Sequence, residues 1–434
     1  MKVFKTFGII ILWTLIILFA VILVALAPSL WRHWVTYPRI TKEIAAFEKL
    51  RKESVPVTSL NTYQGVMHVH SFWSHDSEGT LFDIIPAAKS NNIDFIFLTD
   101  HPHGNSDTLP RGYHGWYDGV LIEAGSEKQG FDTWPLRSTV IDWRRNKDTI
   151  AGEIVQNGGI LFYAHTEEDH NWANPFYQGM EIYNFHTDTK DERLLPQILN
   201  FVVNGNKYRQ LALRQMFDEQ TTVLARWDSL NNIRKVVGFS AVDSHENQNF
   251  RARMLKDGRV EWVGPDANPI DTVDITFRNR WLFGKPDANG WIFKWMIDTY
   301  QEGFRYITNY VMADSLSVPS LKNHILKGHL YTAFKALGDA KGFNFYAEDK
   351  QGRTAGIMGD SLSLAQLGSL KATSPLPGVF RLIHNGKVIL QTEAPGYSFK
   401  FDNPSDKGAY RIEVHLMIGS KLIPWLYTNP VYVY

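Results

Sequence analysis

The chain has 434 residues, of which 44% are hydrophobic and 21% are charged, and its formal net charge is zero. This composition supports folded cores in more than one domain, excludes disorder throughout the chain, and lacks the basic excess of a nucleic-acid binder. Because the chain contains no cysteine, disulfides, thiolate metal ligands and a cysteine nucleophile are excluded. Any metal must be held by nitrogen and oxygen atoms.

The N-terminus carries an apolar run that predicts a transmembrane anchor over residues 1–35. Residues 8–27 (GIIILWTLIILFAVILVALA) contain no charge, and a helix needs roughly 20 apolar residues to cross a bilayer. Trp31 and Trp34 follow, where aromatic side chains settle at a membrane interface. A cleaved signal peptide is the rival interpretation, but Pro28 follows the small-x-small pattern directly and the run exceeds a usual signal core.

The membrane orientation is predicted from flanking charge and domain size. Lys2 and Lys5 precede the apolar run and favour a cytoplasmic N-terminus, although basic residues also follow it. Long domains cross a membrane largely regardless of charge. We therefore expect a single-pass protein of the cytoplasmic (inner) membrane with its bulk on the extracytoplasmic or periplasmic side. Residues 36–61 predict a polar helical stem or linker.

From residue 62, short apolar runs alternate with helical patterns, which predicts βαβ units and a parallel sheet. The expected helices cover the segments TLFDIIPAAKSNN and TIAGEIVQNGG and, more loosely, residues 191–235. The expected strands are GVMHVH, DFIFLTDH, DGVLIEAGSE, ILFYAHTEE, MEIYNFHTD and VVGFSAVDSH.

Histidine and aspartate side chains stand at the ends of these expected strands. In a barrel of alternating strands and helices, the carboxyl ends of the strands meet at one face, and that face carries the chemistry. The strand-end residues are His68, His70, Asp100, His101, His165, His186, Asp243 and His245. We therefore expect them to converge on one cup.

Imidazole and carboxylate groups in one cup predict a metal centre. His68 and His70 are two residues apart on a strand, so both rings point to one side. Borderline cations such as Zn²⁺, Mn²⁺ or Fe²⁺ accept imidazole together with carboxylate, and Glu127 and Asp76 add candidate carboxylates.

Residues 340–434 predict a different unit, an antiparallel β-sandwich. Their apolar runs alternate with polar residues and are separated by glycine and asparagine turns. Asn385–Gly386 between two such runs is a strong hairpin signal. No catalytic residues cluster here, no function is assigned to His324, His329, His384 or His415, and the partner of this unit is unknown.

Six motifs of residues 62–250 together resemble the PHP (polymerase and histidinol phosphatase) superfamily, especially its stand-alone metallohydrolases. The motifs are HVHSFWSHDSEGT, LTDH, AGSE, YAHTE, EIYNFH and AVDSH, in that order. The resemblance implies a distorted (βα)7 barrel, over residues 62–339, that holds two or three metal ions at the carboxyl ends of its strands.

The resemblance also implies roles for individual residues. Asp100 is expected to be a ligand or an orienting partner, and Glu127 to bridge the first two metals. The expected ligands are His68, His70 and Asp243 for the first metal, His165 and His186 for the second, and Asp76, His101 and His245 for the third. The expected catalytic residues are Asp100, His101, Glu127 and His245.

Some alternatives remain open at this level. Glu123 competes with Glu127 as the bridging carboxylate, and His75 competes with Asp76 as a ligand. His75, His103, His114 and His170 are expected to support the site or lie on the surface, and His103, His114 and Arg111 to lie near substrate.

The resemblance favours hydrolysis of a small phosphoester, with a hydroxide that bridges the metals as the nucleophile. A carbamate, ester or amide hydrolase with the same metals is the alternative within the class. A membrane-tethered binding module without catalysis is the alternative from another class. A serine hydrolase is disfavoured because the chain has no Gly-x-Ser-x-Gly elbow.

Overall fold

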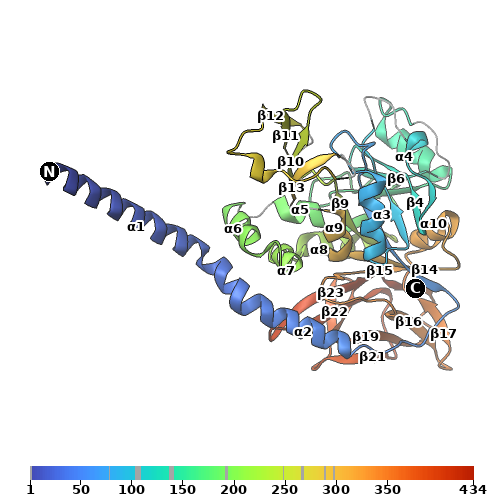
Figure 1. Cartoon of the computed structure of the whole chain (residues 1–434). Helices are drawn as coiled ribbons and strands as arrows, with labels where there is room; N and C mark the ends of the chain where they lie inside the picture. Colours follow the sequence, from blue (N-terminus) through green and yellow to red (C-terminus); the bar gives the residue numbers. More distant parts are fainter. Residues whose placement is uncertain are drawn as a thin grey trace.

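The computed structural model describes residues 2–434 apart from residues 78, 103–108, 136–140, 191–193, 248, 265–267, 288–289 and 297–298. His103 therefore lies outside the described residues. The fold is a mixed α/β body with a long apolar helix at its N-terminus and antiparallel strands at its C-terminus (Figure 1).

The N-terminal helix is continuous over almost 50 residues. It consists of α1 (Lys2–Trp31), a π-helical turn (Arg32–Thr36) and α2 (Tyr37–Lys49). Pro38 has no N–H to donate to the preceding turn, and the π-helical turn lies where proline disturbs a helix. Within the described chain, this is the one helix long and apolar enough to cross a membrane, with a window of mean hydropathy 3.3 that is not buried.

The expected stem is docked on the body. Ile40, Ile44 and Phe47 lie on one stripe of α2 and pack against the main core, as expected for apolar residues at helical spacing. At the lower end, the Tyr397 hydroxyl donates to the Leu50 carbonyl at 2.7 Å. Figure 1 shows α2 running beside the C-terminal strands.

The strands of the body close into a barrel. Parallel pairings join β2 to β1, β1 to β9, β9 to β8, β8 to β7 and β2 to β4. Antiparallel β5 and β6 follow β7, and an Asp100–Ser126 bridge returns to the end of β2. The strands are β1 (Asn61–Val69), β2 (Phe95–Phe97), β3 (Gly115–Tyr117), β4 (Val120–Glu123), β5 (Ser126–Lys128), β6 (Phe131–Trp134), β7 (Ile160–Tyr163), β8 (Gly179–Asn184) and β9 (Val237–Ser244).

The β5–β6 hairpin departs from the expected strand–helix alternation. Gln129 and Gly130 form a two-residue turn with φ values of 58° and 78°. Two central residues with positive φ are typical of the type I′ turn, whose twist matches that of a hairpin. The sheet is therefore mixed, and the (βα)7 description stays a prediction.

Aromatic side chains fill the barrel beneath the strand ends. Phe97, Trp134, Phe162 and Phe239 are fully buried and pack together with neighbouring apolar residues. This plug closes the barrel to solvent, so the polar residues above it form a cup.

Helices follow several barrel strands. α3 starts with a capping box between Thr80 and Asp83, which satisfies free N–H groups at the helix start. The helices are α3 (Leu81–Ser90), α4 (Lys147–Gln156), α5 (Phe185–Lys190), α6 (Leu194–Asn204), α7 (Arg209–Arg214), α8 (Thr221–Asn231), α9 (Tyr300–Tyr306) and α10 (Val318–Lys327). The helices expected at the segments TLFDIIPAAKSNN and TIAGEIVQNGG are confirmed, as is the helical character of the described part of residues 191–235.

A small lobe, missed at the sequence level, follows β9. Its four-stranded sheet has the order β12-β11-β10-β13 and packs around Ala252, Val260 and Ile292. Figure 1 shows it beside the barrel, on the side from which α1 extends. Its strands are β10 (Asn249–Met254), β11 (Val260–Val263), β12 (Pro269–Val273) and β13 (Trp291–Met296).

The C-terminal strands are antiparallel in all but one pairing and are joined to the barrel. β14 pairs with β1 and with β15, and β15 pairs with β23, so hydrogen bonding crosses the expected boundary near residue 340. Long β19 pairs with β16 and β21 in its first half and with β20 and β22 in its second. The hairpin at Asn385–Gly386 is confirmed, with φ values of 48° and 80°. The two-domain division and the sandwich stay predictions.

The bounds complete the description. They are β14 (Thr308–Ala313), β15 (Leu330–Ala333), β16 (Asn344–Asp349), β17 (Thr354–Ile357), β18 (Ser361–Leu362), β19 (Leu367–His384), β20 (Lys387–Gln391), β21 (Gly396–Asp402), β22 (Gly408–Ile418), β23 (Lys421–Thr428) and β24 (Val431–Val433).

Candidate metal centre

Histidine and carboxylate side chains from separate strand ends meet above the aromatic plug. Four overlapping groups place their possible ligand atoms within 4.8 Å of one another. These groups are His70–Asp76–His101–His245, His68–His70–Asp243, His68–Glu127–His165 and His68–Asp132–Glu181.

Glu127 lies at the centre of the cluster. Its Oε2 is 3.2 Å from His68 Nε2 and 3.3 Å from His70 Nε2, and its Oε1 is 3.2 Å from His165 Nε2. Its Oε2 is also 3.5 Å from His101 Nε2. One carboxylate thus faces the imidazoles of three strand ends and the loop after β2, which is the position that a bridging ligand occupies.

His68, His70 and Asp243 form the deepest group. Asp243 Oδ1 lies 3.3 Å from His68 Nε2 and 3.4 Å from His70 Nε2. All three side chains are buried, and Asp243 Oδ1 accepts no hydrogen bond from the described residues. Donor atoms that face one another without aligned hydrogen bonds suit a shared cation.

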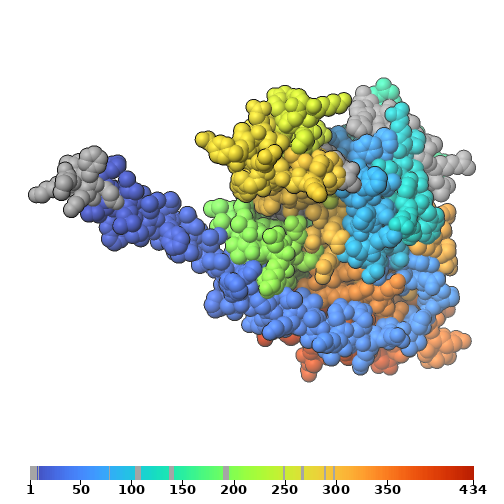
Figure 2. Space-filling view, viewed as in Figure 1, coloured from blue at the N-terminus to red at the C-terminus, as the bar shows by residue number. Residues whose placement is uncertain are grey.

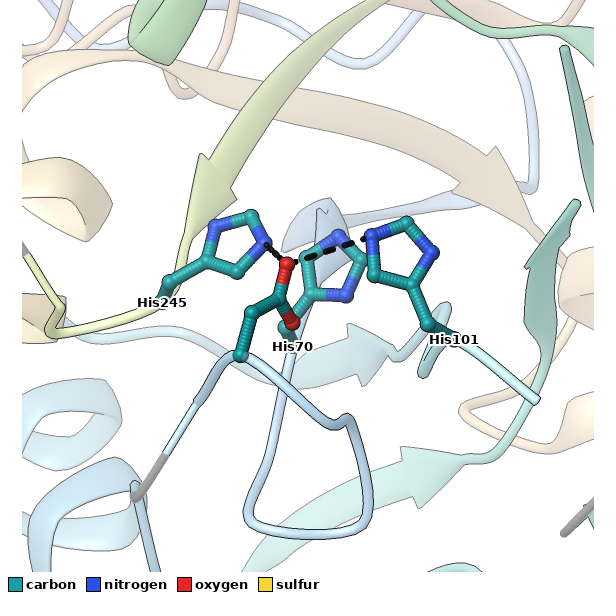
Figure 3. A group of neighbouring side chains, drawn as sticks. His70, His101 and His245 are labelled. Atoms are coloured by element: carbon teal, nitrogen blue, oxygen red, sulfur yellow. Dashed lines mark ion pairs between the residues drawn. The ribbon is translucent and has the colours of Figure 1, made fainter. Parts of the chain in front are cut away.

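Asp76 organises the outer group, which Figure 3 displays. Its Oδ2 lies 3.4 Å from His101 Nε2 and 3.3 Å from His245 Nε2. The His70 ring stacks on that of His245, with 3.9 Å between centroids. Asp76 and His101 are the more open members, with side chains 22% and 23% exposed, so a substrate would reach this side of the cluster first.

The backbone is strained at three of these positions. His68, His165 and Asp243 have φ values of 57°, 49° and 50°, a region that costs a non-glycine residue about 1–3 kcal/mol and tends to occur at functional sites. The β1–β9 register shifts between Met67 and Val69. A bulge of this kind redirects side chains, so His68 reaches the cup by distortion as well as by strand alternation.

Two buried acids, Asp132 and Glu181, were missed by the sequence analysis. Asp132 Oδ2 lies 3.2 Å from His68 Nδ1, and Glu181 also contacts that nitrogen. A carboxylate on the far nitrogen of a ligating histidine fixes its tautomer and ring orientation. Asp132 stands two residues before the inward-facing Trp134 on β6, so strand alternation was the signal that could have revealed it.

Hydrogen bonds hold the ligand groups in place. Asn184 donates to Glu181 Oε2 at 3.1 Å and to Asp243 Oδ2 at 3.3 Å. The Ser74 hydroxyl donates to Asp76 Oδ1 at 2.7 Å and accepts from the His101 backbone N–H at 3.1 Å. The cluster is therefore preorganised from both sides.

Charge within the cluster is matched. Although burial alone would raise them, nearby histidines hold the pKa values of Asp76, Glu127 and Asp243 below their ordinary range. Burial and the neighbouring His245 charge lower the pKa of His70 to about 4, which keeps its ring neutral. Burial also opposes the charge of His101, but Asp76 and Glu127 raise its pKa to about 9.

Asp100 does not face the cluster. Its Oδ1 accepts from the Ser71 backbone N–H at 2.5 Å, and its Oδ2 accepts from the Ser71 hydroxyl at 2.9 Å. Burial raises the pKa of this carboxyl to about 6. Of the two expected roles, this geometry favours the orienting one, because Asp100 holds the loop that follows His70.

His186 lies at one edge of the cluster. Its ring centroid is 5.3 Å from that of His245, and none of the ligand groups among the described residues includes it. The expected pairing of His186 with His165 at one metal is therefore not present in this arrangement. The reason is that His186 sits in the first turn of α5 rather than at the strand end itself.

The open alternatives separate clearly. Glu123 contacts Lys322 and, at 3.4 Å, His114, outside the cluster. His75 is exposed and joins no ligand group, whereas Asp76 does. His170 lies 3.0 Å from the His165 carbonyl and supports the site from behind, and Arg111 is exposed.

The donor set suits divalent cations. Two ligand atoms that are each about 2.1 Å from a tetrahedral ion lie roughly 3.4 Å apart, close to the distances found around Asp243 and Glu127. Imidazole and carboxylate donors match Zn²⁺, Mn²⁺ or Fe²⁺. These residues can therefore hold metal.

Comparisons with known proteins give one structural similarity to report. No protein-family profile and no curated protein matches the chain. A two-domain protein from Bacteroides vulgatus ATCC 8482, described as containing a predicted PHP-like metal-dependent phosphoesterase, is similar at a TM-score of 0.34 and 12% identity. The alignment covers 88% of this chain and 99% of that one. The chemistry of the site is therefore inferred from its own geometry.

Proposed function

We propose that this protein is a metal-dependent hydrolase that cleaves a small phosphoester. The observation that carries the proposal is the place of Glu127, whose two oxygens lie 3.2 to 3.5 Å from ring nitrogens of four histidines. Such a carboxylate can bridge cations and offset their charge. The motif resemblance to the PHP superfamily supports the phosphoester over other bonds.

The residues divide the work among two or three cation positions. His68, His70 and Asp243 hold the deepest position together with Glu127. His165 binds on the other oxygen of Glu127, and Asp76, His101 and His245 hold the outer position. Bound divalent ions supply Lewis acidity and lower the pKa of coordinated water.

Protons are handled by the open side of the cluster. His101 has a raised pKa and a partly exposed ring, so it is suited to give a proton to a departing alkoxide. Asp100 and Ser71 hold the neighbouring loop in place. His68 is kept in one tautomer by Asp132 and Glu181.

The apolar helix places this activity at a membrane. Residues 9–31 form the anchor of a single-pass protein, and the body is on the extracytoplasmic side. The docked α2 then keeps the catalytic cup at a set distance from the bilayer.

The test is a metal-dependence assay on the full chain in detergent. The protein is stripped with a chelator, reloaded with Zn²⁺ or Mn²⁺, and assayed with p-nitrophenyl phosphate, bis(p-nitrophenyl) phosphate and p-nitrophenyl acetate. We expect turnover of a phosphoester that needs metal and is lost in Glu127→Gln but not in His384→Ala. Turnover of acetate alone supports the carbonyl alternative, and metal binding with no turnover supports a binding module.

A further inference from the structure

A second cluster of possible ligands lies where the barrel side of the molecule meets the C-terminal strands. Glu219, Glu413 and His415, here called the interface triad, offer one ligand atom each within 4.8 Å of one another. Glu219 precedes α8, whereas Glu413 and His415 lie on β22. None of the three belongs to the metal centre described above.

The interface triad contains a buried histidine nitrogen without a partner. His415 is 2% exposed, and its Nε2 makes no hydrogen bond with the described residues. That nitrogen is 3.6 Å from Glu413 Oε2, too far for a hydrogen bond. A buried polar nitrogen in this position costs free energy unless a ligand satisfies it.

Both carboxylates are held by one oxygen only. Arg411 donates to Glu413 Oε1 at 2.7 Å, and the Tyr427 hydroxyl donates to Glu219 Oε1 at 2.8 Å. The second oxygen of each carboxylate remains for the site. Orienting donors behind each ligand are the usual surroundings of protein metal sites.

The surrounding charge favours a cation. Asp228, Glu219 and Glu413 supply three carboxylates, and Arg411, which pairs with Asp228 at 2.6 and 2.8 Å, supplies one guanidinium. Arg214, the other nearby cation, packs its guanidinium on the rings of Phe217 and Phe334 at 3.4 and 4.3 Å. The local excess of negative charge is therefore left facing the His415 nitrogen.

We propose that the interface triad binds one divalent cation of the Zn²⁺ type through His415 Nε2 and the free oxygens of Glu219 and Glu413. One imidazole and two carboxylates suit Zn²⁺ with a further position for water. The ion ties the loop before α8 to β22 and so fastens the C-terminal strands to the barrel side. Its role is structural, because its ligands are buried between two layers.

The experiment counts zinc in the full-length protein. The chain is stripped with a chelator in detergent, reloaded with Zn²⁺ and desalted, and bound zinc per chain is measured by mass spectrometry. His415→Ala and Glu219→Gln should each bind one zinc fewer than the unmodified protein. His384→Ala is the matched control, since this histidine is on the same group of strands, stacks on Tyr410 and should leave the count unchanged.

The location of the ion is tested separately from the catalytic proposal. Anomalous scattering at the zinc edge should give a peak between the three side chains, and that peak should persist in His68→Ala. If His415→Ala fails to fold, Glu219→Gln decides, because Glu219 is only partly buried. An unchanged zinc count in the folded variants would overturn the proposal, since His415 would then be protonated and paired with Glu413.

Discussion

The cup above the barrel and the His324–His329 pair below it use the same side chains with different outcomes. In both places imidazoles are buried beside carboxylates. His324 and His329 face each other through Nδ1 atoms 2.9 Å apart. Their Nε2 atoms are 2.8 Å from Asp314 and 2.9 Å from Asp360, respectively.

The difference lies in which atoms remain available. In the His324–His329 pair, each ring nitrogen already has one near partner, so the groups satisfy one another as a closed chain. In the cup, several Nε2 atoms converge on shared oxygens of Glu127 and Asp243. A gathering of histidines thus indicates a metal site only when their free donor atoms point at one place.

The strongest way to break this comparison is to remove a converging ligand. His68→Ala or Asp243→Ala should lower metal-dependent activity by about 100-fold or more, beyond the ~10–100-fold typical of orienting residues, because each group contacts the deepest position. Metal content and phosphoester turnover are the measurements, with far-UV circular dichroism to check that the C-terminal strands remain folded. Full activity with normal metal content in either variant would contradict the site.

The orienting acids offer the next test. Asp132→Asn or Glu181→Gln should weaken metal binding by about 10–100-fold, since His68 loses a partner that fixes its ring. Titration calorimetry with Zn²⁺ measures the affinity. Glu123→Gln is the control, a carboxylate on a barrel strand that contacts Lys322 outside the cup, and its affinity should equal that of the unmodified chain.

Proton release sharpens the comparison further. A protonated imidazole cannot bind metal, and the pKa of His101 is raised to about 9. Metal affinity should therefore rise with pH up to about 9, by about tenfold per pH unit for each proton released. In the metal-free protein the sign is opposite, because stability from charged His101 is present below its ordinary pKa and is lost as pH rises through 9. Calorimetry in buffers of different ionisation enthalpy tests the first statement, and thermal melts in chelator test the second.

The smallest effect on metal is expected at the closed pair. His329→Ala should leave metal content and activity unchanged, yet cost about 1–3 kcal/mol of stability, because His324 is left buried with an unpaired nitrogen. Thermal melts and zinc counting measure the two quantities. A loss of zinc in this variant would show that convergence of free atoms is the wrong criterion.

Local patterns predicted much of this molecule because they depend on neighbouring residues. The apolar run of residues 8–27, the helix over TLFDIIPAAKSNN and the Asn385–Gly386 turn follow from hydrophobic periodicity and positive φ at the turn. The stripe of Ile40, Ile44 and Phe47 was equally visible and should have predicted that the stem docks. The lobe of β10–β13 carried no signal that was recognised, since its strands are short and pack mainly on one another.

By itself, the sequence determined which residue types stand at the strand ends, and so the kind of chemistry that the cup supports. Only the tertiary structure decided which of them face one another. It brought Asp132 and Glu181 under His68, turned Asp100 towards Ser71 and left His186 at the edge. The physical reason is that ligand geometry depends on bulges, hairpin twist and barrel closure, which arise from contacts between segments far apart in the chain.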